Sequence, residues 1–363
     1  MAGRNKTGFA NETRPGSGTL QVLIVDDSVV VRRIMAKVLA EDSRFTIAGA
    51  VASGEQAVEF AHARHVDLVL LDMNLPGEDG LSVLGKILSH DRETLVVLLS
   101  AALREGSDMA LKALAMGASD VIAKPAAGHF SPSFIAHLRD RLHHLTPAAE
   151  RARTPELDDQ AAARLRPLGT VVRAVAIGGS TGGISSLTAV MAGFKGHVPV
   201  PIFITQHLPA NFQPLFAEQL RRTTHLPVVI ADDGIEVKAG TVYIAPGTAH
   251  LSLYRSATGL IAIKHSKEAC LHGGYPAVDP MFRAIGNVYG TGACGVILSG
   301  MGRDGLAGAQ AIAAAGGWLI AQDHATSAVW GMPGSVAKAG LASAILPPNA
   351  IAQTILRQRQ TAA

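Results

Sequence analysis

Five polar side chains stand at the ends of short apolar runs in the first half of the sequence. Asp26 and Asp27 follow the first run, Asp72 closes a later one, and Ser100 and Lys124 end two more. If these runs are parallel strands, their carboxyl ends meet at one sheet edge, where three carboxylates repel one another unless a cation lies among them. Such oxygen ligands suit Mg²⁺, and a lysine with a hydroxyl can hold phosphoryl oxygens. The pattern therefore predicts phosphoryl transfer to a carboxylate, with Asp72 as the nucleophile.

A second reactive pattern lies in the other half of the chain. The string GGSTGG at 178–183 follows an apolar run and fits G-x-S-x-G, the strand-to-helix turn that exposes a serine, here Ser180. His207 and Asp304 each follow a later apolar run, so the three side chains are expected at one sheet edge. A serine nucleophile needs a base, and an aspartate can orient that base. The combination predicts acyl transfer, with N–H groups at the helix start available to an oxyanion.

The glycine-rich turn has a rival interpretation, because such turns also bind dinucleotides. The spacing G-x-G-x-x-G is absent, and no acidic residue ends a clear second strand about 20 residues further on. A dehydrogenase is therefore a weaker, fold-level alternative. A catalytic metal in this half is not expected either, because no histidine pair with helical spacing lies in an acidic cluster.

Short apolar runs alternate with amphipathic stretches in both halves, and this alternation predicts the scaffold that positions the reactive residues. Strands alternating with helices are typical of a parallel sheet covered by helices on both faces, so the predicted fold class is α/β. The predicted strands are Val22–Val25, Leu68–Leu71, Leu95–Leu99, Val121–Ala123, Val171–Ile177, Ile202–Thr205 and Val296–Leu298; the predicted helices are Val29–Leu39, Glu55–Ala63, Leu81–Leu88, Met109–Met116 and one from Ser185.

The alternation is interrupted once. Residues 143–168 contain three prolines and little hydrophobic periodicity, which indicates a linker. A length of 363 residues predicts two domains, at roughly 150 residues per domain. We expect a disordered tail at 1–18, domains at 19–142 and 169–355, and a second tail at 356–363.

Composition narrows the class of protein. Hydrophobic residues make up 48% and charged residues 17%, which excludes a disordered chain. A net charge of +3 without a run of lysine and arginine predicts no nucleic-acid partner. The two cysteines, Cys270 and Cys294, form no C-x-x-C pair, which argues against a disulfide scaffold or a zinc site. Without a long apolar stretch or an apolar leader, we expect a cytoplasmic protein with no membrane insertion, and a monomer by default.

The first pattern resembles the receiver domain of bacterial response regulators over residues 19–142. The resemblance implies a flavodoxin-like domain with a five-stranded parallel sheet and phosphorylation of Asp72. It also implies a Mg²⁺ site made by Asp27 and Asp72, by Asp26 partly through water, and by the carbonyl of Asn74. The matching strings are DD at 26–27, DMNLPG at 72–77, DG at 79–80, SA at 100–101 and KP at 124–125.

The same resemblance implies that Ser100 and Lys124 report the phosphoryl group to the rest of the domain. One position departs from the family pattern. Receivers usually carry tyrosine or phenylalanine three residues before the lysine, and this chain has Val121 there. The usual coupled rotation of a hydroxyl residue and an aromatic ring therefore lacks its aromatic partner, although other surface changes can transmit the signal.

The second pattern resembles the catalytic domain of the chemotaxis-specific protein-glutamate methylesterases, the CheB family. The resemblance implies that Ser180 is the nucleophile, His207 the general base and Asp304 the residue that orients it. Thr181 would lie beside the nucleophile, and the N–H of Met301 would stabilise the oxyanion. Residues 169–348 carry the match, in the strings IGGSTGG at 177–183, ITQHLP at 204–209, PGTAH at 246–250, VDPMF at 278–282, LSGMGRDG at 298–305 and VWGMP at 329–333.

Together the two resemblances imply an enzyme switched on by phosphorylation. It would hydrolyse glutamyl methyl esters on chemoreceptors to glutamate and methanol and deamidate selected glutamines. The substrate would be the methylated cytoplasmic domains of chemoreceptors, and a chemotaxis histidine kinase would donate the phosphoryl group. Mg²⁺ would serve the receiver, and the esterase reaction would need no cofactor.

Two further positions in the second half bear on the substrate cleft. Tyr275 stands in YPA at 275–277, where the family usually has an arginine that shapes the substrate cleft, so substrate preference is expected to differ. His250 is expected to be structural or to line the cleft. The rival function is a phosphorylation-controlled binding protein whose esterase-like domain is inactive. A transcription factor is less favoured, because no basic recognition helix is present.

Overall fold

The computed structural model describes most of the chain between residues 19 and 360. The predicted tail at 1–18, the predicted linker from residue 146 to 168 and the last residues of the second tail, 361–363, lie outside the described residues. The described ranges are 19–91, 94–100, 108–125, 130–145, 171–194, 198–208, 210–270 and 274–360.

The first half of the chain folds around a parallel five-stranded sheet with the order β2-β1-β3-β4-β5. This is the strand order of flavodoxin-like domains, as the resemblance implied. Strand β2 was absent from the predicted strands because only one of its side chains is fully buried, which removes the apolar run. The bounds are β1 (Leu20–Val25), β2 (Phe45–Val51), β3 (Leu68–Asp72), β4 (Leu95–Ser100) and β5 (Asp120–Ala123).

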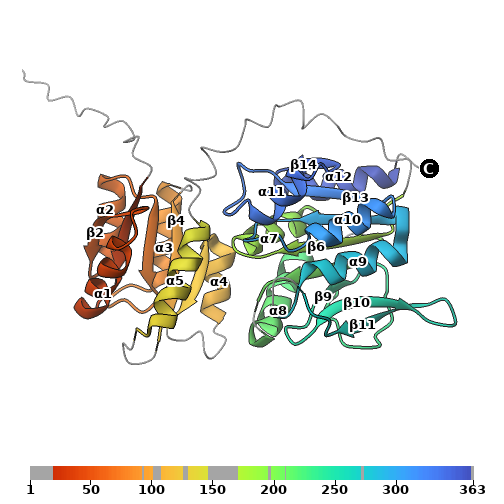
Figure 1. The fold of residues 1–363 in the computed structure, drawn as a ribbon, viewed down its shortest axis with the longest axis horizontal. Helices are drawn as coiled ribbons and strands as arrows, with labels where there is room; N and C mark the ends of the chain where they lie inside the picture. Colours follow the sequence, from red (N-terminus) through yellow and green to blue (C-terminus); the bar gives the residue numbers. More distant parts are fainter. Residues whose placement is uncertain are drawn as a thin grey trace, which may run out of the picture.

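Helices alternate with these strands and flank the sheet (Figure 1). Helices α1 to α4 begin and end within two residues of the predicted bounds. The first three are preceded by the N-cap residues Ser28, Ser53 and Asp79, whose side chains each accept a backbone N–H of the first turn. The helices are α1 (Val29–Ala40), α2 (Gly54–Ala63), α3 (Gly80–His90), α4 (Asp108–Met116) and α5 (Pro132–Leu145).

The second half contains a parallel seven-stranded sheet with the order β14-β13-β12-β6-β7-β9-β8 and an antiparallel hairpin of β10 and β11. The predicted α/β class is therefore confirmed here too. The predicted start of β6 was wrong, because Val171 is 37% exposed and the strand begins at Ala174. The bounds are β6 (Ala174–Gly179), β7 (Ile202–Gln206), β8 (Val228–Ile230), β9 (Val242–Ile244), β10 (His250–Arg255), β11 (Ile261–Ser266), β12 (Ala293–Ile297), β13 (Trp318–Gln322) and β14 (Ala344–Leu346).

The helices of this half begin mostly at glycine-rich or proline-containing turns. Helix α7 starts at Gly183, two residues before the predicted Ser185, because Gly182 takes the left-handed conformation (φ 70°) and serves as its N-cap. The helical segments are α7 (Gly183–Gly193), η3 (Ala210–Phe212), α8 (Gln213–Thr224), α9 (Val278–Tyr289), η4 (Gly290–Gly292), α10 (Leu306–Ala314), α11 (Gly331–Lys338) and α12 (Pro348–Gln360).

The two halves contact each other through the side of the first sheet that carries α4 and β5. Helix α4 packs against α7 and α8, and Figure 1 shows the two lobes side by side with α4 at their junction. Leu114 and Val121 pack against the core of the second half, while Met301 and Val329 pack against the core of the first. Each half thus contributes apolar side chains to the core of the other.

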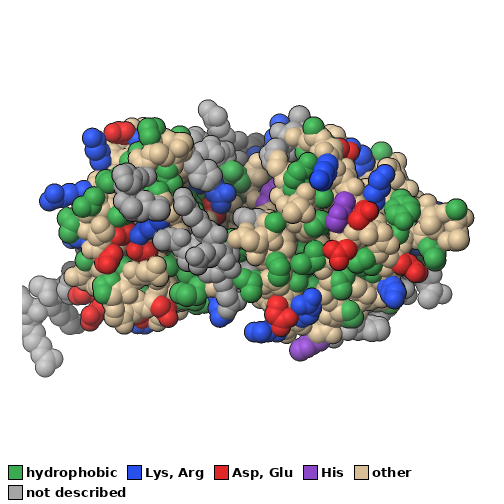
Figure 2. Space-filling model, turned by 90° about the horizontal axis from the view of Figure 1, so that it is seen from below, with side chains coloured by type: hydrophobic (Ala, Val, Ile, Leu, Met, Phe, Trp, Pro, Cys, Tyr) green, Lys and Arg blue, Asp and Glu red, His purple; other side chains and the backbone are tan. Residues whose placement is uncertain are grey.

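Acidic and basic side chains are interspersed on both lobes of the face in Figure 2, which carries no broad basic surface of the kind that binds nucleic acid. No helix in the described ranges has both the length and the apolar character needed to cross a bilayer.

Candidate functional site

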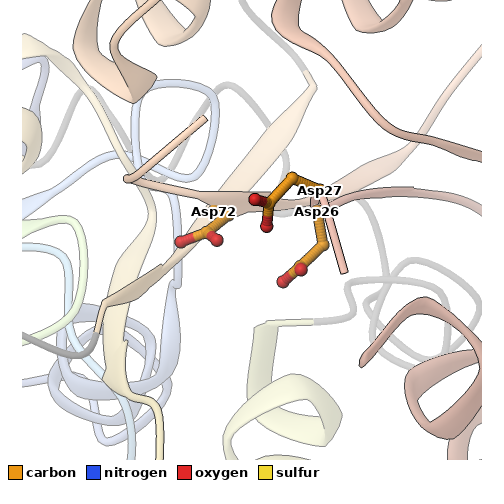
Figure 3. A group of neighbouring side chains, drawn as sticks. All are labelled: Asp26, Asp27 and Asp72. Atoms are coloured by element: carbon orange, nitrogen blue, oxygen red, sulfur yellow. The ribbon is translucent and has the colours of Figure 1, made fainter. Parts of the chain in front are cut away.

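The predicted acidic site lies at the carboxyl ends of β1 and β3. Asp26 and Asp72 are buried and Asp27 is exposed, and the three carboxylates can place oxygens within 4.8 Å of one another (Figure 3). Lys124, just past β5, places Nζ 2.6 Å from an oxygen of Asp26 and 2.6 Å from one of Asp72. The fold therefore brings these four side chains together from three separate strand ends.

The donor set of this site fits a hard divalent cation. Oδ2 of Asp26 is buried and accepts no hydrogen bond, although it lies 2.6 Å from the ammonium of Lys124, which donates to Asp72. One ammonium among three carboxylates leaves the site negative, and Mg²⁺ would offset that charge. Asn74 is exposed next to the site, and its N–H donates to Oδ1 of Asp72 at 3.2 Å.

Asp72 combines burial with few hydrogen-bond donors. Burial raises the pKa of its carboxyl above the usual value, against the hydrogen bond and charge of Lys124 and the N–H of Asn74, which lower it. The neighbouring Asp26 adds to the rise. The ionised form of Asp72, which is the nucleophilic one, is therefore poorly stabilised by the protein alone.

The residues predicted to sense the phosphoryl group lie on the two strands beyond β3. Ser100 is buried at the end of β4, and its carbonyl accepts the N–H of Lys124 at 2.9 Å. Val121 lies in β5, and its side chain packs against the core of the second half. The position that lacks the usual aromatic ring therefore faces the other domain directly.

Ser180 lies in the turn between β6 and α7, and backbone and side-chain contacts hold this turn. Its N–H donates to the carbonyl of Ser299 at 3.0 Å, and its carbonyl accepts Gln206 Nε2 at 2.7 Å and the N–H of Gly183 at 2.8 Å. The loop after β12 also comes close, because a Cβ at Gly300 would lie 2.9 Å from Cβ of Ser180. The backbone conformation of Ser180 is therefore strongly constrained.

His207 follows β7, the strand next to β6, and its N–H donates to the carbonyl of Gly179 at 3.0 Å. Its ring places Nε2 2.7 Å from Oδ2 of Asp304, which leaves Nδ1 as the nitrogen available to take a proton. Within the described residues, Ser180 makes no hydrogen bond to this ring. Hydrogen bonds between catalytic groups are often long in the absence of substrate and shorten when it binds.

Asp304 is 1% exposed, yet hydrogen-bond donors surround its carboxylate. The N–H groups of Val278, Asp279 and Gly305 donate to it at 2.7, 3.0 and 2.9 Å. Val278 and Asp279 begin α9, which has no side-chain cap of its own, so Asp304 caps this helix from a different loop. Burial alone would raise the pKa of Asp304, but the hydrogen bonds from His207 and the two helix N–H groups lower it below its usual value.

A cleft of about 610 Å³ opens at this edge of the seven-stranded sheet. Tyr275 is 41% exposed at its side, and its ring lies on that of His250 with centroids 4.6 Å apart. The cleft brings together all six predicted residues of the second half: Ser180, Thr181, His207, Tyr275, Met301 and Asp304.

Receiver residues line the same cleft. Nε of Arg141, in α5, donates to Oδ2 of Asp120 at 2.6 Å, and both residues line the cleft. The rest of β5 and Leu114 of α4 line it as well. The two predicted sites are therefore separate, but the wall of the second is built in part from the domain that carries the first.

Three residues that support the turn around Ser180 were not predicted from the sequence. Gln206 holds its carbonyl, Ser299 accepts its N–H, and Ser299 Oγ also donates to the carbonyl of Thr181 at 2.8 Å. Gln322 in turn accepts the N–H of Ser299 at 2.8 Å. The only available signal was an amide or hydroxyl side chain at the end of an otherwise apolar run.

Comparisons with known proteins agree with this architecture. The family profile described as CheB methylesterase matches residues 175–355, and that of the response regulator receiver domain matches residues 22–129. The chain is 36% identical over 357 residues to a "protein-glutamate methylesterase/protein-glutamine glutaminase" of Nitrobacter hamburgensis, covering 93% of both chains. It is also 36% identical over 347 residues to a protein of the same description from Trichodesmium erythraeum, covering 93% of this chain and 98% of that one.

One solved structure is similar to the second half. The CheB methylesterase catalytic domain of Thermotoga maritima matches with a TM-score of 0.50 and 38% identity, over 52% of this chain and 99% of that chain.

Proposed function

Because this chain belongs to the CheB family of protein-glutamate methylesterases and protein-glutamine glutaminases with a receiver domain, we propose that Ser180, His207 and Asp304 carry out its ester hydrolysis. The single observation that carries this assignment is the pair of His207 and Asp304, 2.7 Å apart, in the same cleft as the glycine-flanked Ser180. Phosphorylation at Asp72 controls the reaction. The substrate is a glutamyl methyl ester on a chemoreceptor.

In the proposed mechanism, Oγ of Ser180 attacks the ester carbonyl while the free nitrogen of His207 takes the hydroxyl proton. The tetrahedral intermediate collapses, and His207 passes the proton to the departing methanol. Water then attacks the acyl-enzyme by the same route and releases glutamate. A glutamine side chain follows the same path and releases ammonia in place of methanol.

Asp304 acts in this mechanism as a permanent anion. Its lowered pKa keeps it ionised at neutral pH, so it holds the imidazole in one tautomer and stabilises the imidazolium that forms in each half of the reaction. The oxyanion is stabilised by backbone N–H groups at the cleft, with Met301 as the proposed donor. Removal of one such donor typically costs about 3–4 kcal/mol of transition-state stabilisation.

The receiver supplies the control. Asp26, Asp27, Asp72 and the carbonyl of Asn74 are proposed to hold Mg²⁺, which supplies positive charge for phosphoryl transfer from a chemotaxis histidine kinase. Lys124 neutralises part of the charge that the phosphoryl group brings, about −2 at neutral pH.

In the unphosphorylated chain, the receiver is proposed to restrict the cleft. Leu114, Val121 and the pair of Asp120 and Arg141 stand at the cleft wall, where a helix of a large protein substrate would have to enter. Added charge at Asp72 shifts β5 and weakens this contact. Truncation to residues 169–363 should then raise the basal activity, and an unchanged rate would exclude simple occlusion.

This proposal divides the chain into a receiver at 19–142 and a methylesterase domain at 169–355, joined by the segment 143–168, whose first three residues complete helix α5. Its partners are the cytoplasmic domains of chemoreceptors and the kinase, which places the reaction in the cytoplasm.

The decisive experiment measures methanol release from a tritium-methylated receptor fragment, with and without Mg²⁺ and acetyl phosphate. Release that rises with the phosphodonor and disappears in Ser180→Ala supports both the triad and its control. Equal release by wild type and Ser180→Ala would refute the triad. No release from a validated receptor would favour a binding function.

A further inference from the structure

His250 is a buried histidine that the proposed mechanism does not use. It begins β10, is 1% exposed, and follows a loop that packs closely on the segment after His207. A Cβ at Gly247 in this loop would lie 2.2 Å from Cα of Ala210, so the loop and that segment are in direct contact.

Both ring nitrogens of His250 are engaged. The N–H of Ala277 donates to Nδ1 at 2.9 Å, and Nε2 lies 3.1 Å from the carbonyl of Glu268. Because Nδ1 accepts, the ring proton lies on Nε2 and donates to that carbonyl. The imidazole therefore links the segment at Glu268 to the segment that begins α9.

The residue that His250 holds is the N-cap position of α9. Ala277 has no side chain able to cap a helix, and the next two N–H groups, of Val278 and Asp279, point at Asp304. The three successive N–H groups at this helix start thus go to His250 and to the aspartate of the triad. A shift of Ala277 would displace both backbone donors of Asp304 together.

The same ring also contacts the cleft wall. Tyr275, two residues before Ala277, lies against the imidazole with a centroid separation of 4.6 Å. One buried side chain therefore contacts both the segment that supports Asp304 and the exposed aromatic residue of the cleft.

We propose that His250 is a positioning residue for the esterase: it fixes the N-terminus of α9, and through it the carboxylate of Asp304 and the imidazole of His207. This inference rests on the proposed function, since it assigns a role within the same site. His250 does not touch the reacting atoms.

Paired variants of the full chain test this role. His250→Asn keeps an acceptor near the position of Nδ1 and loses the donor to Glu268, whereas His250→Gln reaches the position of Nε2 and loses the acceptor for Ala277. His265→Ala is the matched control, because His265 lies on the partner strand β11 and its ring contacts the carbonyl of Ala231, away from the cleft.

Two rates are measured on protein activated with Mg²⁺ and acetyl phosphate: methanol release from a peptide that carries a glutamate γ-methyl ester, and labelling of Ser180 by a fluorophosphonate. We expect His250→Gln to lower kcat and the labelling rate by about 10- to 100-fold, with KM within about threefold, because small misplacements of catalytic groups cost this much. We expect the kcat and labelling rate of His250→Asn to stay within about fivefold of wild type, and those of His265→Ala to equal wild type. Both variants keep the hydrogen bond to the N–H of Ala277.

Equal losses in Asn and Gln variants of equal thermal stability would overturn the positioning role, as would a change confined to KM. Labelling also separates this inference from the proposed substrate. Wild type that labels but does not cleave the ester contradicts the proposed function, while the comparison of labelling rates still decides the role of His250.

Discussion

Two buried aspartates at the carboxyl ends of parallel sheets show how differently this chain treats the same side chain. Asp304 is 1% exposed and receives hydrogen bonds from three backbone N–H groups and a histidine. Asp72 is 4% exposed, receives one backbone N–H, and shares one ammonium with a second carboxylate. The pKa of Asp304 is lowered, and that of Asp72 is raised.

The two carboxylates differ in what stabilises their ionised form. The N-terminus of α9, which the fold holds in place, stabilises the carboxylate of Asp304, so its charge is permanent and suits the orientation of a base. Asp72 lacks such donors, which fits the proposed role of a carboxylate that relies on Mg²⁺ and accepts a phosphoryl group. The two aspartates thus differ in their hydrogen-bond donors rather than in their burial.

The largest expected effect comes from removing the negative charge of Asp304. Asp304→Asn should lower kcat for methyl ester hydrolysis by about 10³- to 10⁴-fold, because the imidazole loses its orientation and the imidazolium its counter-charge. Methanol release by the activated protein measures it. A loss below tenfold in a folded variant would contradict the assigned role of Asp304.

The matching change in the receiver should alter only the activation by a phosphodonor. Asp72→Asn should abolish the response to acetyl phosphate, a coupling typically worth about 5- to 150-fold, while the unstimulated rate stays unchanged. Asp79→Asn is the control, because Asp79 is an exposed helix N-cap where asparagine serves equally well. Activation that persists in Asp72→Asn would show that a residue other than Asp72 is phosphorylated.

The two aspartates should have opposite effects on stability. Asp304→Asn should lower the free energy of unfolding of its domain by about 1–3 kcal/mol at neutral pH, because the amide keeps one acceptor oxygen and turns an NH₂ donor toward the other buried N–H donors. Asp72→Asn should stabilise the receiver without Mg²⁺ by less than about 1 kcal/mol, because the change relieves repulsion with Asp26 but also removes the ion pair with Lys124. Urea unfolding separates the domains, because both tryptophans, Trp318 and Trp330, report the methylesterase domain and circular dichroism reports the whole chain.

The pH dependence of these effects also differs in sign. The lowered pKa of Asp304 stabilises the fold above the unfolded value, about 4, and this contribution is lost as pH falls through the lower folded pKa. The raised pKa of Asp72 destabilises the fold at neutral pH, and this penalty disappears as pH falls through the raised value. Parallel pH profiles for the two variants would contradict the comparison.

The smallest expected effect concerns the contact that joins the two regions. Val121→Thr keeps the shape of the side chain but places a hydroxyl in the apolar contact with the second domain. It should raise unstimulated methanol release up to about fivefold, because the lost contact is worth about 1 kcal/mol. An unchanged rate with normal phosphorylation would show that this contact does not restrict the cleft.

The sequence by itself determined the α/β class and the family. Strand-end residues such as Asp72, Ser180 and His207 follow apolar runs, and the ends of parallel strands must meet at one edge. Their proximity could therefore be predicted from local pattern. Strand β2 and the starts of β6 and α7 could not, because partial exposure, or a left-handed glycine at a cap, leaves little trace in an apolar pattern.

Only the tertiary structure decided which groups support the reactive ones. Asp304 accepts from residues 25 and 26 positions away, and His250 holds Ala277 at a separation of 27. The receiver residues at the cleft lie further still from Ser180 along the chain. Hydrogen bonds need placement within a few tenths of an ångström, which packing of distant segments sets and local sequence does not encode.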